Sequence, residues 1–402
     1  MRRQIAAPDS QIMQKKKGSQ EVMKEFDTSI SDSQATAVEP IAPDLFDYAA
    51  YAEYAADKSE TIQRFIEADS GLLVYRRMRA GECFSGQCRD MEYSLAMQLG
   101  ALQKSMAYAA DIPNFLEPWY GIGTAAAAFG IDYEWEEGQA PAIRPAFDTV
   151  AEALACETLS IKDTDCGRHT LEMINYFMEK TGGQLPISLC DMQSPLNVVC
   201  NMVDSTSIYL AMMDDPDSVR TLLDKVAGLI VDFRAEQTAL LGKTLASPGH
   251  GFPSSHLFRS TGLSDDNIVM LSDDMYSDLA APSFNRISSA CHGASFHSCG
   301  DWSGKIETVK QLDNIFMVDG AFSPATDPTP NDPEPFGKAF AGTGIILNAR
   351  VVGSEDEVAD VVERIWQPGL KLIVTTYCQT PEEQAICYDR MMGDRIMENC
   401  QM

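Results

Sequence analysis

The chain has 402 residues, of which 31 are lysine or arginine and 59 are aspartate or glutamate, so its formal net charge at pH 7 is −28. Charged residues make up 22% of the sequence and hydrophobic residues 45%. This balance is typical of a folded protein with a large buried core and not of a disordered polyanion. Binding to nucleic acid or to an anionic membrane surface is disfavoured, because both depend on clustered positive charge.

Residues 1–45 are polar and weakly patterned, which predicts a flexible or loosely attached extension. From Met1 to Lys24, six basic and two acidic residues give 6 − 2 = +4, so the rest of the chain carries −28 − 4 = −32. The extension lacks the apolar core of a signal peptide, and no stretch of the chain has the roughly 18 uninterrupted apolar residues of a membrane helix. We therefore expect a cytoplasmic protein with reduced cysteines.

Helices and strands alternate along the remainder of the chain. Apolar residues at helical spacing from Leu45 to Phe65 predict helices ahead of the main fold. Further helices are expected to begin at the N-cap Asp215 and at the capping boxes 354–357 and 380–383. The expected strands are 185–190, 315–318, 344–348 and 370–377.

This alternation predicts parallel βα units and therefore an α/β fold. The length favours a single (β/α)8 TIM barrel over residues 46–402, leading helices included. No glycine-rich dinucleotide motif follows any of the strands, since Gly121-Ile122-Gly123 lacks the rest of that pattern. Cys166-Gly167-Arg168-His169 has ligand-like spacing but no second pair nearby, and we interpret it as a polar loop.

The most informative segment for chemistry is 293–301. If 294–299 is a strand, His297 and Cys299 point to the same face, as two ligands of one metal ion would. A glycine follows at once, which places the pair at the carboxyl end of the strand, where barrels build their active sites. Cys378 closes a later strand in the same way. Two thiolates and one imidazole form a ligand set typical of catalytic zinc, with a fourth position left open.

From about Asp111 to Met392 the chain resembles the uroporphyrinogen decarboxylase-like barrels, and within them the zinc-dependent methyltransferases that act on corrinoid proteins. The resemblance is carried by Asp191-Met192-Gln193-Ser194-Pro195-Leu196, Met213-Asp214-Asp215-Pro216, Leu271-Ser272-Asp273-Asp274, Ala281-Pro282-Ser283-Phe284, Phe296-His297-Ser298-Cys299-Gly300 and the segment 369–381. It implies that His297, Cys299 and Cys378 bind one zinc ion.

The resemblance also implies a reaction. Zinc bound by two thiolates and an imidazole is formally neutral, and it would deprotonate an incoming thiol. The thiolate would then take a methyl group from cobalt, with the corrinoid supplied by a partner protein. In a second type of relative, zinc polarises a small methyl donor and the methyl group is loaded onto cobalt. The expected cofactor is one Zn²⁺ per chain, and the expected partners are a corrinoid protein and a small thiol acceptor or methyl donor.

Two other functions stay open. A metal-free decarboxylase of the same superfamily would use arginines and an aspartate; Asp111 lies near the place of that aspartate, and Met78-Arg79-Ala80-Gly81 is similar to the arginine motif. Glu82-Cys83 stands where the second arginine of that motif would follow, and a net charge of −28 is unfavourable for a polyanionic porphyrinogen. The third function is non-catalytic, in which a zinc-stabilised barrel serves only to bind a corrinoid protein.

Four further polar residues are candidates for the pocket. Asp273 and Asp274 precede an expected helix and could cap it, whereas the resemblance implies that an acidic residue here touches substrate or the fourth zinc position. Asp191 and Gln193 follow a strand and could bind a polar group of the cofactor or substrate, or satisfy loop backbone. The chain departs from the family at Asn348-Ala349-Arg350, where relatives often have Gly-Asn, and we expect a reshaped pocket there.

Overall fold

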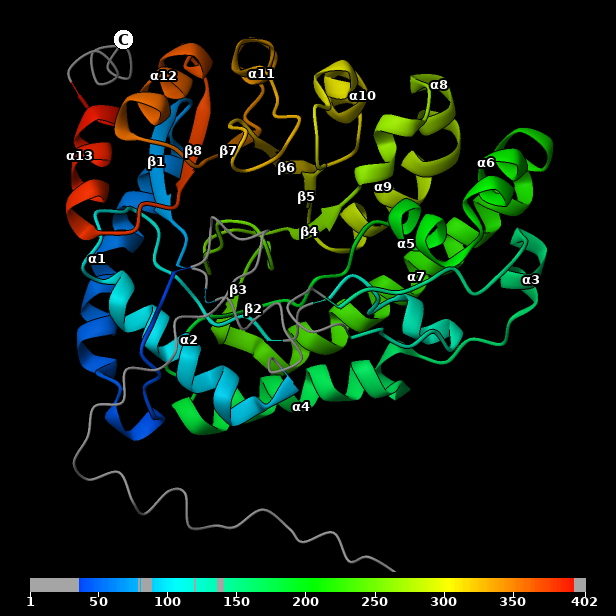
Figure 1. The fold of residues 1–402 in the computed structure, drawn as a ribbon, viewed down its shortest axis with the longest axis horizontal. Coiled ribbons are helices and arrows are strands. Elements are labelled where there is room, and N and C mark those ends of the chain that lie inside the picture. The colour runs from blue at the N-terminus through cyan, green and yellow to red at the C-terminus, as the bar shows by residue number, and fades with distance from the viewer. Residues whose placement is uncertain (1–35, 79, 81–88, 119–120, 136–140, 394–402) are drawn as a thin grey trace, which may run out of the picture.

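The structure is a computed structural model that describes residues 36–78, 80, 89–118, 121–135 and 141–393 (Figure 1). Most of the predicted N-terminal extension lies outside these ranges, as do Arg79 and residues 81–83 of the arginine-like motif. The part of the extension that is described packs on the fold: Thr36 is buried and accepts a hydrogen bond of 2.8 Å from Arg76 Nη2.

Six parallel strands form the main sheet in the order β1-β8-β7-β6-β5-β4. Their bounds are β1 Gly71–Arg76, β4 Thr261–Ser264, β5 Ala294–His297, β6 Ile315–Ala321, β7 Ile346–Val351 and β8 Lys371–Thr376. A second, two-stranded parallel sheet consists of β2 (Ile187–Ser188) and β3 (Leu245–Ala246). The strands are almost entirely buried, as is typical of parallel sheets covered by helices.

Helices connect the parallel strands, and α9, α10, α11 and α12 stand in a row along one side of the sheet in Figure 1. The helices are α1 Tyr48–Glu67, α2 Met91–Ser105, α3 Val150–Ala155, α4 Asp165–Thr181, α5 Pro195–Met202, α6 Ser205–Asp214, α7 Pro216–Leu241, α8 Asp273–Met275, α9 Ala281–Ala290, α10 Ile306–Lys310, α11 Pro333–Phe340, α12 Glu355–Ile365 and α13 Pro381–Met391. Within the described ranges, no helix is both long and apolar enough to cross a bilayer.

Backbone hydrogen bonds connect segments beside the small sheet to both edges of the main sheet or to each other. Asp111 N donates to Val74 O on β1 over 2.8 Å, and Leu116 N donates to Pro186 O beside β2 over 2.9 Å. On the other side of the small sheet, Gly262 N of β4 donates to Pro248 O over 2.9 Å. The predicted α/β fold with a helix ahead of the first strand is therefore confirmed, and its continuous ladder runs over the six strands of the main sheet.

Local sequence signals account for where several helices begin. Both predicted capping boxes are present: Ser354 and Thr380 accept from the backbone of Glu357 and Glu383, whose carboxylates bond back to the caps. The Asp215 side chain caps α7 as predicted.

The segment from Cys166 to His169 is not the polar loop that we predicted, because it forms the first turns of α4. The side chain of Thr164 accepts from Gly167 N and caps the helix, and residues such as Met173 and Phe177 bury its inner face. The sequence signal for this helix is the cap at Thr164, which precedes the segment.

Candidate metal centre

Three possible metal ligands meet at the carboxyl ends of β4 and β5. His297 is the last residue of β5, and its Nε2 lies 3.3 Å from Cys299 Sγ. Asp266 follows β4, and its Oδ1 lies 3.8 Å from the same Nε2. One nitrogen, one sulfur and one carboxylate oxygen all lie within 4.8 Å of one another. These are the three donor types that zinc takes in proteins, and a fourth position would remain for water or substrate.

Backbone hydrogen bonds fix this arrangement locally. Asp265 N donates to His297 O over 2.7 Å, which ties the end of β4 to the end of β5. Cys299 N donates to Asp266 Oδ1 over 2.7 Å, so the loop that carries the thiol is attached to the carboxylate. His297 ends a strand, while Asp266 and Cys299 each follow a strand end by two residues, so these two backbone hydrogen bonds hold all three donors near the spacing of neighbouring strands.

A buried carboxylate on the next strand orients the imidazole. Asp319 of β6 pairs in register with His297, is 2% exposed, and lies 2.6 Å from His297 Nδ1. Asp319 also accepts from Arg350 Nε over 3.0 Å and from the side-chain amide of Asn348, its register partner on β7. With Nδ1 held in this way, Nε2 is the nitrogen that faces Cys299 and Asp266, as the carboxylate–histidine–metal arrangement requires.

The same contacts determine the protonation of this pair. Burial acts to lower the pKa of His297, but the neighbouring Cys299 and the hydrogen bond to Asp319 outweigh it and raise the pKa to about 10. Burial acts to raise the pKa of Asp319, but the charge of Arg350 and the bond to His297 lower it overall. Asp319 is therefore ionised and accepts hydrogen bonds. His297 is surrounded by negative charge, which favours a positive charge at its ring, whether a proton or a bound metal ion.

The cluster lines a cavity of about 300 Å³. Its lining residues are Arg77, Ile122, Asp191, Gln193, His250, Gly251, Phe252, Ser264, Asp266, His297, Cys299, Asp319 and Arg350. The predicted pocket residues Asp191 and Gln193 are both among them. Gln193 Nε2 donates to the two oxygens of Asp191 over 3.0 and 2.9 Å, and its Oε1 accepts from Asn197, which also donates to Asp266 Oδ2 over 2.8 Å. A continuous polar chain thus connects Asp191 to the candidate ligand Asp266.

Cys378 lies apart from this cluster. It follows β8, and the neighbouring thiol of Cys387 on α13 lowers the pKa of Cys378. Its backbone oxygen accepts from Arg76 Nε over 2.7 Å. Cys378 is absent from the described residues that line the cavity, and the third donor near His297 and Cys299 is the carboxylate of Asp266.

The predicted acidic pair Asp273 and Asp274 sits on the surface. Asp273 is on α8 and forms an ion pair of 2.8 Å with Lys305, whose hydrogen bond lowers the pKa of Asp273. The helix is capped by Ser272, and neither aspartate is among the described residues that line the cavity. Three aspartates line the cavity, Asp191, Asp266 and Asp319, and of these the sequence predicts only Asp191. The tripeptide Ser-Asp-Asp occurs at 264–266 and again at 272–274, and only the first copy follows directly on a strand.

Asp111 is engaged in structural hydrogen bonds. Its two carboxylate oxygens accept from Val74 N and from the hydroxyl of Tyr388 on α13, each over 2.8 Å. Burial raises the pKa of Asp111, although these two bonds oppose the shift. Asp111 is not among the described residues that line the cavity. Its two hydrogen bonds connect β1 to α13.

Comparisons with known proteins find one matching family model and two solved structures to which the chain is similar. The family model for uroporphyrinogen decarboxylase matches residues 67–242. Among solved structures, the chain is similar to a methyltransferase from Methanosarcina mazei, with a TM-score of 0.54 and 13% identity, covering 75% of this chain and 85% of that one. It is more weakly similar to the carboxyl transferase domain from Rhizobium etli pyruvate carboxylase, with a TM-score of 0.35 and 9% identity, covering 91% of this chain and 52% of that one. No curated protein sequence matches the chain.

These comparisons show different amounts about the chain. At 13% identity the likeness to the methyltransferase extends to the fold alone, and the weaker likeness does not extend that far. The matched range 67–242 ends before Asp266, His297 and Cys299, so the cluster rests on its own geometry. The resemblance that the sequence predicts is nevertheless confirmed as far as these comparisons extend, by the family match over residues 67–242 and by the likeness in fold.

Proposed function

We propose that the chain is a zinc-dependent methyltransferase that moves a methyl group between a corrinoid on a partner protein and a small thiol or other small molecule. The main support is the cluster of one imidazole nitrogen, one thiol sulfur and one carboxylate oxygen within 4.8 Å, opening into a cavity. The family match and the similarity to a methyltransferase fold support an enzyme of this general type.

Three residues would hold the metal ion. His297, Cys299 and Asp266 supply one neutral and two anionic donors, so bound Zn²⁺ would be formally neutral, as it would be with Cys378 in place of Asp266. Bound zinc would lower the pKa of a coordinated thiol, so that the substrate reacts as a thiolate. Cys378, which the family resemblance implies as a ligand, is the alternative third donor.

The remaining residues of the cavity would orient and shield the reaction. Asp319 orients the imidazole through Nδ1, and Gln193 fixes the carboxylate of Asp191. Burial raises the pKa of Asp191, which suits a group that receives the proton of the thiol. The corrinoid would be the methyl donor: the thiolate sulfur would take its methyl group, and the electron pair of the carbon–cobalt bond would remain with cobalt on the partner protein.

The two alternatives have less support. A decarboxylase that depends on Asp111 needs this carboxylate to face substrate, whereas both of its oxygens accept structural hydrogen bonds. A non-catalytic zinc-stabilised binding protein would require the metal for folding, yet the candidate ligands lie at strand ends above an extensive hydrophobic core.

The test is metal analysis of anaerobically purified full-length protein, followed by a methyl-transfer assay from methylcobalamin to a small thiol. We expect about one zinc per chain, loss of transfer on chelation, recovery with added zinc, and circular dichroism that does not change. Unfolding on chelation would favour the non-catalytic alternative. A folded protein that binds no zinc and transfers no methyl group would refute the proposal.

A further inference from the structure

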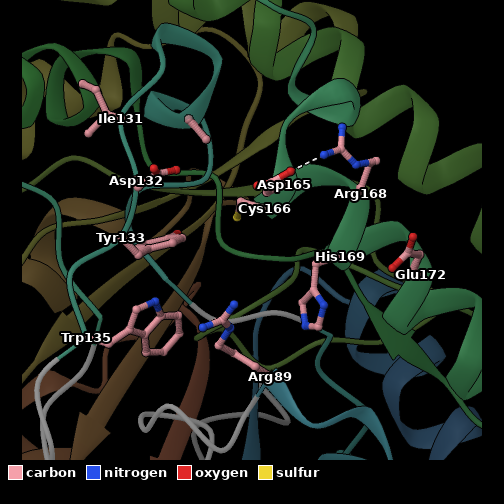
Figure 2. A pocket seen from close by; sticks show the side chains of 11 residues that line it. Arg89, Ile131, Asp132, Tyr133, Trp135, Asp165, Cys166, Arg168, His169 and Glu172 are labelled. Carbon is pink, nitrogen blue, oxygen red and sulfur yellow. Dashed lines mark hydrogen bonds and ion pairs between the residues drawn. The ribbon is translucent and has the colours of Figure 1, made fainter. Parts of the chain in front are cut away.

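A second cavity, of about 520 Å³, shares no lining residue with the first. Its walls come from the first turns of α4, from the segment 127–135, and from Arg89 just ahead of α2 (Figure 2). Its volume lies within the range of pockets that hold small molecules.

The aromatic wall of this cavity is built into the fold. The rings of Tyr133 and Trp135 lie 5.8 Å apart, and the hydroxyl of Tyr133 accepts from Gly123 N over 2.8 Å. A Cβ at Gly123 would come within 2.8 Å of the Tyr133 ring, so the glycine is needed for this close approach. The Gly121-Ile122-Gly123 segment therefore has a steric role in seating Tyr133.

The positive charge of Arg89 lies against the aromatic wall of the cavity. The guanidinium of Arg89 stacks over the Trp135 ring at 5.3 Å from its centroid, and no ion pair joins Arg89 to a carboxylate among the described residues. Arg168, by contrast, is paired with Asp165. Figure 2 shows Arg89 between Trp135 and His169. Burial, and then the charge of Arg89, lowers the pKa of His169, so a neutral imidazole faces the arginine at neutral pH.

The charges of the lining residues define the ligand. After Arg168 and Asp165 cancel, Arg89 remains as one positive charge, with Asp132 and Glu172 as two negative charges. A ligand that is purely anionic would meet this excess of carboxylates and the net charge of −28 of the whole chain. A purely cationic ligand would leave Arg89 without a counter-charge.

We propose that this cavity binds a zwitterionic small molecule of the amino-acid type, with its carboxylate on Arg89 and an ammonium group toward Asp132 or Glu172. An arginine that stacks on tryptophan presents its N–H groups in a fixed plane, which suits a carboxylate. The faces of Tyr133 and Trp135 would pack on the rest of the ligand and favour its ammonium group.

Isothermal titration of the full-length protein with three probes tests this assignment. Glycine, L-lysine and L-glutamate carry the same α-carboxylate and α-ammonium groups and differ in net charge. We expect L-lysine to bind most tightly, glycine more weakly, and L-glutamate to show no binding.

Arg89→Gln should weaken L-lysine binding by about tenfold or more, because a charge-assisted pair is lost. Arg64→Gln, a substitution at an exposed arginine of α1, should leave binding unchanged.

Three further variants test the carboxylate side of the cavity, the need for a positive charge at position 89, and independence from the metal centre. Glu172→Gln should weaken L-lysine more than glycine, and Arg89→Lys should recover part of the affinity. His297→Ala should bind the probes as the unaltered protein does, so this result is independent of the metal centre. Absence of binding by all three probes, binding of L-glutamate as tight as that of L-lysine, or full affinity in a folded Arg89→Gln variant would overturn the proposal.

Discussion

The ends of β5 and β8 carry the same sequence signal but have different surroundings. At the end of β5, Cys299 lies beside His297 and Asp266, in a cavity. At the end of β8, Cys378 has the thiol of Cys387 as its neighbour, on α13, which lies next to β1 and β8 in Figure 1. A cysteine that closes a parallel strand is thus equally compatible with ligation and with packing, and the neighbouring elements decide which of the two it serves.

The largest expected effect distinguishes these two cysteines. Cys299→Ala should abolish zinc binding in anaerobically purified protein, because it removes one of two anionic donors. If Asp266 is the third ligand, Cys378→Ala should keep most of the zinc and Asp266→Asn should lose it. Elemental analysis per chain measures both results, with Cys156→Ala as the matched control, since this thiol lies near Phe129 and outside the cluster. Zinc loss in Cys378→Ala with retention in Asp266→Asn would reverse the assignment.

The next largest effect tests whether Asp319 orients His297 at the end of β5. Asp319→Asn keeps the shape of the side chain but weakens its hold on His297 and Arg350, so zinc affinity should fall about 10- to 100-fold. Competition with a chromophoric chelator measures the affinity. Asp313→Asn, just ahead of β6, is the control and should bind zinc normally. Unchanged affinity in Asp319→Asn would mean that Asp319 is not an orienting partner of a zinc ligand.

A stability measurement tests the structural hydrogen bonds of Asp111, between β1 and α13. Asp111→Ala leaves Val74 N and the Tyr388 hydroxyl without their acceptor, which should cost about 1–3 kcal/mol in the free energy of unfolding. Zinc content should not change. Urea titration gives the free energy, with the exposed Asp57→Ala as control. Full stability combined with lost catalysis would instead revive a direct role for Asp111 in the reaction.

The smallest effect compares thiols in the two cavities. Burial raises the pKa of Cys166 to about 12, so its reactive thiolate is scarce at pH 7.5 and increases only as the pH approaches that value. Cys299 is exposed. A brief treatment with N-ethylmaleimide at pH 7.5, read by peptide mass spectrometry, should modify Cys299 and spare Cys166, and added zinc should protect Cys299. Equal labelling of both thiols would contradict the burial of Cys166.

Some of the site was accessible from the sequence because it depends on local periodicity. The spacing of two residues was enough to bring His297 and Cys299 together, although β5 ends at His297 and Cys299 lies in the loop that follows, outside the predicted strand 294–299. Asp191 and Gln193 were found from their place after a strand. The caps at Ser354 and Thr380 depend on contacts three residues apart and were equally readable. Asp319 carries no such signal, because it becomes a partner of His297 only through the register of β5 against β6.

The sequence by itself determined the α/β alternation, the capped helices and the His-x-Cys pair, since each arises from residues within one or two turns or pleats of one another. Only the tertiary structure decided that Asp266, and not Asp273 or Asp274, reaches the cavity, and that Cys378 lies against Cys387. The two Ser-Asp-Asp copies are identical as local sequence. They differ in that the first ends a strand beside β5, whereas the second begins an exposed helix, and that difference exists only once the strands have paired.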